Sequence, residues 1–353
     1  RLGTYRALII GVDDYEDPDW ETLQAPEKDA QAIYDVLTEK YGFEKENTEL
    51  LLGKKATKSA VEAALLHLAD KAESNDAVMI YYAGHGDYKR EKPDGKKKGG
   101  CWILRDGIGK RCNNNVLQVA NLRSFFEDIK AKHLLVMADS CFSGSLAQRD
   151  IDAGEPKPKL QTYHRFLERN SNQVLSAGDY DKSVLDELSV GRHSPFADVI
   201  LRRLDSPENK EGYVHAKELE TALQQTYESN PKVDYVPSLD TLIGHQNDQA
   251  SAFVFIPKEA QASLRVAPKP DAENERDTLS KLTTILKLQK IAKASENSRI
   301  SAYAAPFWRA ALAIDQGTDL TDGIGGSSLP GLHGVTPEDL GTFLKTRILA
   351  LSH

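Results

Sequence analysis

Two short apolar segments, each ending abruptly in polar and small residues, place the strongest constraint on the fold of this chain. Residues 77–83 (AVMIYYA) run directly into Gly84-His85-Gly86, and residues 134–138 (LLVMA) run into Asp139-Ser140-Cys141. Apolar runs of this length, bounded by turn residues, are typical of buried strands. Parallel strands of an α/β sheet carry their functional residues at the carboxyl edge. The sequence therefore predicts two neighbouring parallel strands that bring His85 and Cys141 together.

A thiol next to an imidazole can act as a nucleophile. A lone cysteine is only a few per cent thiolate at neutral pH, and a nearby imidazole that accepts the thiol proton raises that fraction. Taken singly, Cys141 fits a buried core thiol and His85 fits an ordinary loop histidine. Taken together, at the ends of two matching strands, they indicate a catalytic pair.

The two motifs resemble those of a known enzyme family. Tyr82-Ala83-Gly84-His85-Gly86 and Asp139-Ser140-Cys141-Phe142-Ser143-Gly144 are similar to the His and Cys boxes of caspase-like cysteine peptidases, most closely the metacaspases and their bacterial relatives. In caspases the His lies about 50 residues before the Cys, as it does here. The resemblance spans residues 5–257 and implies a mostly parallel six-stranded sheet flanked by helices. It also implies a Cys–His dyad, with the amides of Gly86 and Cys141 forming the oxyanion hole.

The resemblance further implies specificity for basic residues, and Arg is expected to exceed Lys because its planar guanidinium offers paired donors to two carboxylates. Caspases carry Gln two positions before the Cys, whereas this chain carries Asp139, as metacaspases do. In metacaspases a second acid joins this Asp to bind Arg or Lys, and Asp29 falls at that position, although Lys28 replaces the usual Asn. The alternative for Asp29 is an acid in the first turn of a helix. Ser176 and Asp179, around the end of a further strand, are additional candidates for the pocket.

The rest of the chain predicts alternating strands and helices. Further strands are expected at residues 5–12, 49–53, 172–178 and, last, 252–257. Thr57 and Ser194 are expected to begin helices. Residues 1–258 are predicted to form the peptidase domain, 259–272 a linker, and 273–353 a helical C-terminal region that either docks on the domain or binds a regulatory protein. Residues 145–171 contain prolines and basic residues and are predicted to be cut by the enzyme itself.

Composition excludes several other classes. The net charge of −8, from 45 basic and 53 acidic residues, argues against nucleic acid as a partner, despite the lysines of segment 87–115. No apolar run approaches the ~20 residues of a membrane helix. Three cysteines are too few for a disulfide framework, which favours a reducing compartment and a cytoplasmic location. Cys101 and Cys112 are expected to be core thiols.

Two further questions are whether the protein needs a cofactor and whether it is a peptidase at all. No metal-ligand set stands out, so no cofactor is expected, while the activation by calcium that occurs in part of the metacaspase group cannot be read from the residues. The rival to a peptidase is a catalytically idle caspase-like scaffold that binds partners through its helical tail. The presence of both His85 and Cys141 favours the peptidase.

Overall fold

A computed structural model describes most of the N-terminal three quarters of the chain. The described residues are 2–91, 97–141, 143–148, 166–178, 193–207, 212–229, 235–248 and 251–265. The chain divides into two units, Arg1–Ala267 and Pro268–His353. Asp179, the predicted C-terminal helical region and most of the predicted self-cleavage segment lie outside the described residues.

A central sheet organises the first unit, with strand order β2-β1-β3-β7-β9-β11-β8. The pairings from β2 to β9 are parallel, whereas β11 runs antiparallel to both β9 and β8. The predicted mostly parallel, six-stranded sheet is confirmed, and the short β8 extends it. The strands are β1 (Tyr5–Gly11), β2 (Phe43–Leu52), β3 (Ala77–Ala83), β7 (His133–Asp139), β8 (Ala147–Gln148), β9 (Ser171–Ser176) and β11 (Ser238–Leu242).

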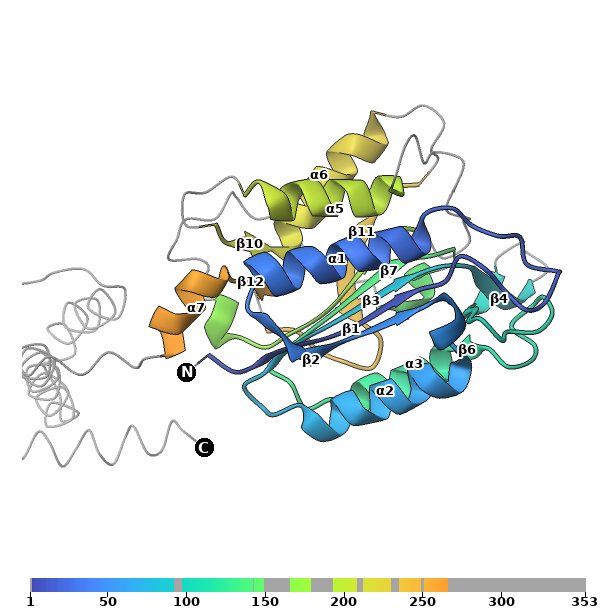
Figure 1. The fold of residues 1–353 in the computed structure, drawn as a ribbon, viewed down its shortest axis with the longest axis horizontal. Helices are drawn as coiled ribbons and strands as arrows, with labels where there is room; N and C mark the ends of the chain where they lie inside the picture. Colours follow the sequence, from blue (N-terminus) through green and yellow to red (C-terminus); the bar gives the residue numbers. More distant parts are fainter. Residues whose placement is uncertain are drawn as a thin grey trace, which may run out of the picture. The chain divides into compact units, whose positions relative to one another are not determined.

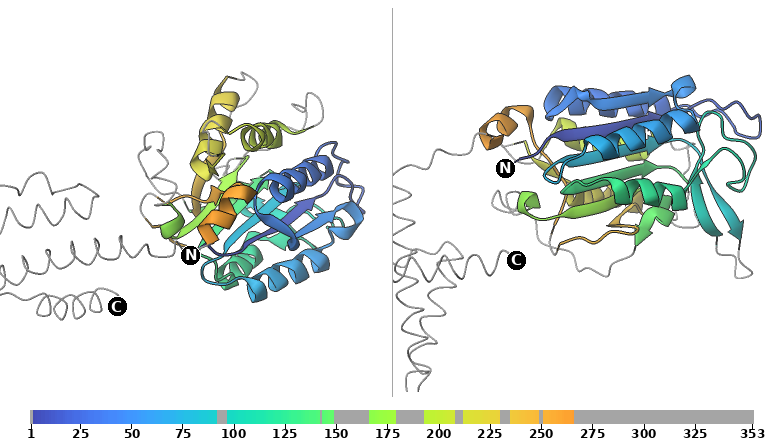
Figure 2. Two further views of the ribbon diagram at one scale, coloured as in Figure 1. Left: turned by 60° about the vertical axis from the view of Figure 1, so that its left-hand side comes forward. Right: turned by 90° about the horizontal axis from the view of Figure 1, so that it is seen from below.

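Helices cover both faces of this sheet, because side chains of alternate strand residues point to opposite sides. Ile9 and Met79 belong to one apolar core, and Ile10 and Ile80 belong to the other. Figures 1 and 2 show α1, α5 and α6 over the first face and α2 and α3 over the second. The helices are α1 (Pro26–Lys40), α2 (Lys58–Lys71), α3 (Val119–Asp128), α5 (Pro195–Asp205), α6 (Ala216–Glu228) and α7 (Lys258–Arg265), with short 3₁₀ turns η1 (Gly53–Lys55) and η2 (Ser143–Leu146).

The register between β3 and β7 positions the two motifs. The strands pair in parallel from Ala77 opposite His133 to Ala83 opposite Asp139. His85 and Cys141 each lie two residues beyond this last pair, so the chain leaves both strands at the same edge. The prediction of two neighbouring parallel strands is confirmed.

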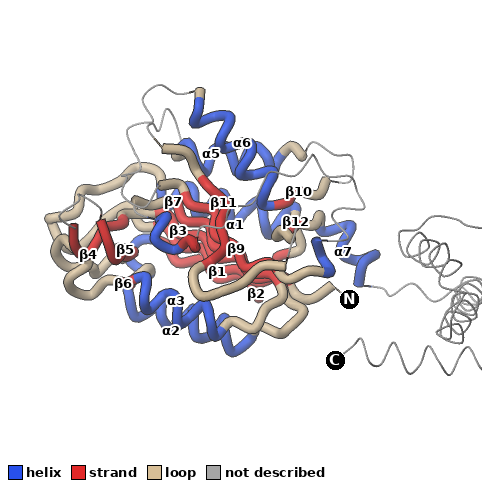
Figure 3. Tube along the Cα trace, turned by 180° about the vertical axis from the view of Figure 1, so that it is seen from behind, coloured by secondary structure: helices blue, strands red, loops and turns tan. Residues whose placement is uncertain are grey.

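Two small sheets flank the central one (Figure 3). The first contains β4 (Gly86–Glu91), β5 (Lys97–Trp102) and β6 (Leu117–Gln118), and it begins directly after the His85 motif. The second pairs β10 (Val214–His215) with β12 (Val254–Phe255). The expected last strand at 252–257 is therefore short and lies outside the central sheet.

Two features differ from the sequence-based expectations. The sixth strand of the central sheet is β11, whose sequence Ser-Leu-Asp-Thr-Leu carries too few apolar residues to stand out as a buried strand. Residues 258–265, expected to belong largely to a linker, form α7 instead. The two expected helix starts are confirmed, since Thr57 Oγ1 accepts from Ala60 N at 3.3 Å and Ser194 Oγ accepts from Ala197 N at 3.0 Å.

Candidate active site

The backbones of the two motifs touch at the carboxyl edge of β3 and β7. A Cβ added at Gly86 would lie 2.1 Å from the carbonyl oxygen and 3.3 Å from the amide nitrogen of Cys141, a contact that only glycine permits. Gly84 N also donates to Asp139 O at 3.4 Å. Cys141 is half-buried and is not part of a disulfide. The structure thus brings together the backbones of the two residues whose amides are predicted to form an oxyanion hole.

The imidazole of His85 is held by the loop that connects β1 to α1. Its Nε2 lies 2.8 Å from the carbonyl oxygen of Glu21. The rings of Tyr15 and Trp20 pack against it, with centroid distances of 5.0 and 5.3 Å. A carbonyl oxygen can only accept a hydrogen bond, so Nε2 carries the proton and, in the neutral ring, Nδ1 carries the lone pair.

The backbone of His85 is fixed as well. His85 N donates to the Tyr15 hydroxyl at 2.8 Å, and that hydroxyl donates to Val12 O at 3.0 Å. Ile103 N donates to His85 O at 3.0 Å, and the Tyr82 hydroxyl lies 2.6 Å from the same carbonyl oxygen. Three elements therefore restrain the position of this residue.

Asp29 and Asp139 come together at the N-terminus of α5. Ser194, the residue that caps this helix, bridges them: its amide donates to Asp29 Oδ2 at 3.1 Å and its hydroxyl donates to Asp139 Oδ2 at 2.5 Å. His193 Nδ1 lies 2.6 Å from the other oxygen of Asp29. Both carboxylates are buried, at 0 % exposure for Asp29 and 7 % for Asp139. We refer to Asp29 and Asp139 below as the acid pair.

The burial of the acid pair makes it unfavourable for both carboxylates to be charged unless a cation lies nearby. Burial raises the pKa of Asp29, although hydrogen bonds from Ser194 and His193 oppose the rise. Burial raises the pKa of Tyr81 well above its usual value, and the nearby charges of Asp139 and Asp29 raise it further. The Tyr81 hydroxyl is buried and has no hydrogen-bond partner among the described residues. An added cation would therefore be stabilised here.

Ser176, a further pocket candidate, lies at the end of β9 opposite Ala138, the residue before Asp139. Ser176 is 1 % exposed, and its hydroxyl lies 3.4 Å from that of Ser238 on β11. Asp179 lies outside the described residues. Sequence reasoning missed His193 as a partner of Asp29. It identified Ser194 only as a helix cap, and its contact with the acid pair has no signal in the sequence.

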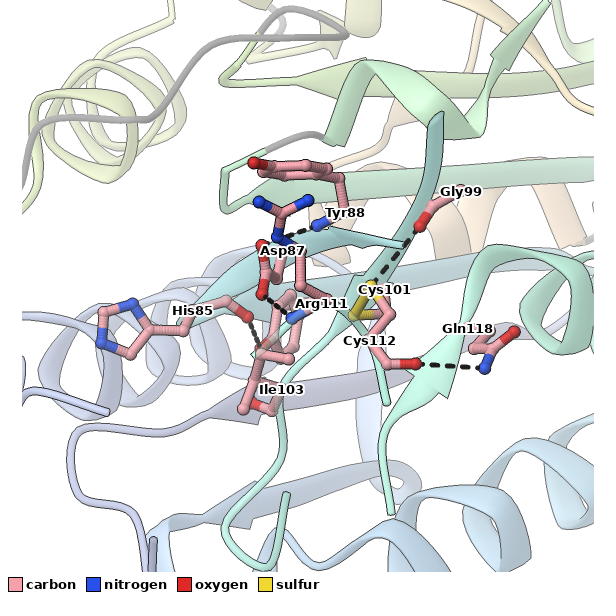
Figure 4. The surroundings of a disulfide bond; sticks show 10 residues. His85, Asp87, Tyr88, Gly99, Cys101, Ile103, Arg111, Cys112 and Gln118 are labelled. Atoms are coloured by element: carbon pink, nitrogen blue, oxygen red, sulfur yellow. Dashed lines mark hydrogen bonds between the residues drawn. A yellow bond between two sulfur atoms is a disulfide. The ribbon is translucent and has the colours of Figure 1, made fainter. Parts of the chain in front are cut away.

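Cys101 and Cys112 form a disulfide, which corrects the expectation that both are core thiols (Figure 4). Cys101 lies on β5 opposite Asp87 of β4, and the amide of Arg111 donates to Asp87 Oδ2 at 2.6 Å. Lys110 Nζ lies 3.6 Å from the centroid of the Trp20 ring. The disulfide therefore fastens the segment of Lys110 and Arg111, which contacts Trp20 beside the His85 ring and Asp87 two residues after His85. This disulfide removes the support that the small number of cysteines gave to a reducing compartment.

We expect thiol titration to detect this bond. The unfolded chain should show one reactive thiol without reductant, three after reduction, and none without reductant in Cys141→Ala. The double variant Cys101→Ser/Cys112→Ser should lose about 3 kcal/mol of unfolding free energy in urea denaturation, because the bond closes a loop with a sequence separation of 11 residues. Three reactive thiols in the absence of reductant would contradict the disulfide.

The described residues show neither a metal cluster nor a membrane helix. They contain no group of three or more His, Cys, Asp or Glu side chains that could hold a metal ion, and no helix long and apolar enough to cross a membrane. The expectation that no cofactor is needed stays a prediction, and this observation does not test activation by calcium. A cavity of about 470 Å³ lies between α2 and the edge of the sheet, where it is lined by Arg6, Glu49 and His67 among others, but by neither His85 nor Cys141.

Comparisons with known proteins agree with the resemblance in the sequence. Residues 4–250 match the protein family described as "Caspase domain". Metacaspase-4 of Arabidopsis thaliana is 26% identical over 149 residues, covering 40% of this chain and 34% of the relative. Metacaspase-1 of Eremothecium gossypii is 26% identical over 155 residues, covering 40% and 32%. The chain thus matches about a third of the length of each of these relatives.

Solved structures with lower sequence identity are also similar to this chain. A protein from Geobacter sulfurreducens superposes with a TM-score of 0.46 and 19% identity, covering 67% of this chain and 92% of that one. Caspase-1 from Spodoptera frugiperda superposes with a TM-score of 0.43 and 12% identity, covering 67% and 86%.

Proposed function

Because this chain belongs to the caspase-domain family of cysteine peptidases, we propose that it cleaves proteins after basic residues with Cys141 and His85 as its catalytic dyad. The close approach of Gly86 to the backbone of Cys141 supports the dyad, and the acid pair supports the preference for a basic residue. The acid pair is the observation that carries the specificity, because a planar guanidinium offers two or more donors to buried carboxylates.

The hydrogen bond at His85 supports one direction of proton transfer. With Nε2–H donated to Glu21 O, Nδ1 accepts the proton of the Cys141 thiol. The thiolate then attacks the carbonyl carbon of the scissile bond. The negative charge moves to the carbonyl oxygen, where the amides of Gly86 and Cys141 donate to it.

The reaction is completed by returning the proton. His85 Nδ1 gives it to the nitrogen of the leaving amine, the carbon–nitrogen bond breaks, and a thioester to Cys141 remains. A water molecule, deprotonated by the same ring, hydrolyses the thioester and releases the acid product. We also propose that this activity cuts the chain within residues 145–171 and operates in a regulated proteolytic pathway.

Four peptides that differ only in the residue before the scissile bond test the proposal. Arg should give the highest kcat/KM, followed by Lys, with Leu far lower and Asp lowest, because the acid pair repels a third carboxylate. Equal hydrolysis of all four would contradict the basic preference and leave the dyad unaffected. No hydrolysis of any of them, or of a mixed peptide library, would favour the idle scaffold.

A further inference from the structure

His193 occupies one side of the acid pair in this structure. Its Nδ1 lies 2.6 Å from Asp29 Oδ1, while the amide of Ser194 holds Oδ2. The side chain of His193 is 27% exposed, whereas that of Asp29 is fully buried. Both oxygens of Asp29 therefore have partners, and a basic side chain from outside meets an occupied carboxylate.

We propose that His193 is a specificity-determining residue of the substrate pocket, which holds Asp29 Oδ1 in the empty enzyme and is displaced by the basic side chain of the substrate. This inference rests on the proposed preference for basic residues. His193 would then take the place of the substrate cation between turnovers and set how strongly Arg or Lys must bind to replace it.

The local structure permits this displacement without unfolding α5. Ser194 anchors the start of the helix through its contacts with Ala197, Asp29 and Asp139, and none of these involves the His193 side chain. Rotation of the His193 side chain about χ1 therefore releases Asp29 Oδ1 and leaves the bridge between the two acids intact. Because the His193 imidazole is already partly exposed, this rotation moves it into solvent.

The need to displace His193 from Asp29 lowers the apparent affinity for the substrate. A ligand that binds only the open form has its dissociation constant multiplied by the inverse of the open fraction. A charge-assisted hydrogen bond from a partly exposed group is strong enough to keep the open form in the minority. Removing the imidazole should therefore lower KM for an Arg peptide by about fivefold, with kcat changed less than about twofold.

The opposite role for His193 is support of the acid pair. If the imidazole only orients Asp29, its removal leaves a buried carboxylate with fewer donors, and KM for Arg should rise. The two roles thus predict opposite changes in KM, and steady-state kinetics separate them.

The experiment compares His193→Ala, His193→Asn and the control His67→Ala, which removes an exposed imidazole from α2 on the opposite face of the sheet. The Asn side chain places an amide donor at the position of Nδ1, so it should retain the wild-type KM. His67→Ala should also match wild type. A fivefold lower KM for Arg in His193→Ala alone supports the proposal, and an unchanged or higher KM overturns it.

A second measurement on the wild-type protein does not depend on the variants. Benzamidine, a small amidinium, should release His193 from Asp29 and speed its modification by diethylpyrocarbonate, followed by mass spectrometry. Slower or unchanged modification under saturating benzamidine contradicts the displacement. If the wild-type enzyme does not prefer Arg over Leu, the proposed preference for basic residues fails, and this inference fails with it. If that preference holds and only the His193 results disagree, this inference alone fails.

Discussion

Replacing Cys141 with alanine is expected to abolish peptide hydrolysis, because the variant has no nucleophile to form the thioester. Loss of a catalytic nucleophile commonly lowers kcat on the order of 10⁶-fold, below the detection limit of a peptide assay. The same variant should stay intact within residues 145–171 if that cut is self-inflicted. Hydrolysis of an Arg peptide and the intact mass of both proteins check these outcomes.

His85→Ala should be nearly as severe, and the double variant should be no worse than Cys141→Ala, because the two residues act as a unit. Iodoacetamide should also label Cys141 more slowly in His85→Ala, since the thiolate is lost. Circular dichroism and the His67→Ala variant control for folding and for loss of an imidazole as such. Full activity in Cys141→Ala, or unchanged labelling in His85→Ala, would remove the dyad from the mechanism.

The position of the two motifs was predictable because it depends on local sequence. Residues 77–83 and 134–138 are apolar at every position, as strands buried on both faces require, and each run ends where polar residues begin. Parallel pairing then places both ends at one edge, and the register of Ala83 opposite Asp139 confirms that pairing. The grouping of Asp29 with Asp139 had a different source, since it came from the family resemblance.

The other contacts of the site could not be read from the residues. Glu21 acts through its backbone carbonyl, which every amino acid possesses, so residue identity carries no signal. Cys101 and Cys112 are 11 positions apart, a spacing that fits two core thiols as well as a disulfide. His193 meets Asp29 across 164 residues of sequence, and only the packing of α5 beside α1 brings them together. Such long-range contacts follow from tertiary packing.

The acid pair makes a quantitative prediction about the substrate. Asp139→Asn should lower kcat/KM for an Arg peptide by about 10²- to 10³-fold while changing that for a Leu peptide less than about threefold. Two unit charges ~4 Å apart at an effective dielectric near 20 interact by roughly 4 kcal/mol, and each ~1.4 kcal/mol changes a rate tenfold. Asparagine keeps an oxygen to accept from the Ser194 hydroxyl, so the bridge to Asp29 survives.

The control for this variant is Asp205→Asn, the same chemical change at the far end of α5, where the carboxylate is 64% exposed and contacts Lys40. It should leave the ratio of Arg to Leu hydrolysis at the wild-type value. Thermal unfolding of Asp139→Asn should show no loss of stability, because the variant removes a buried negative charge from beside another. An unchanged Arg-to-Leu ratio in a folded Asp139→Asn protein, or faster cleavage after Asp than after Arg in the wild type, would exclude the acid pair as the pocket. Neither result would argue against the Cys141–His85 dyad, because in the proposal the acid pair selects the substrate and the dyad breaks the bond.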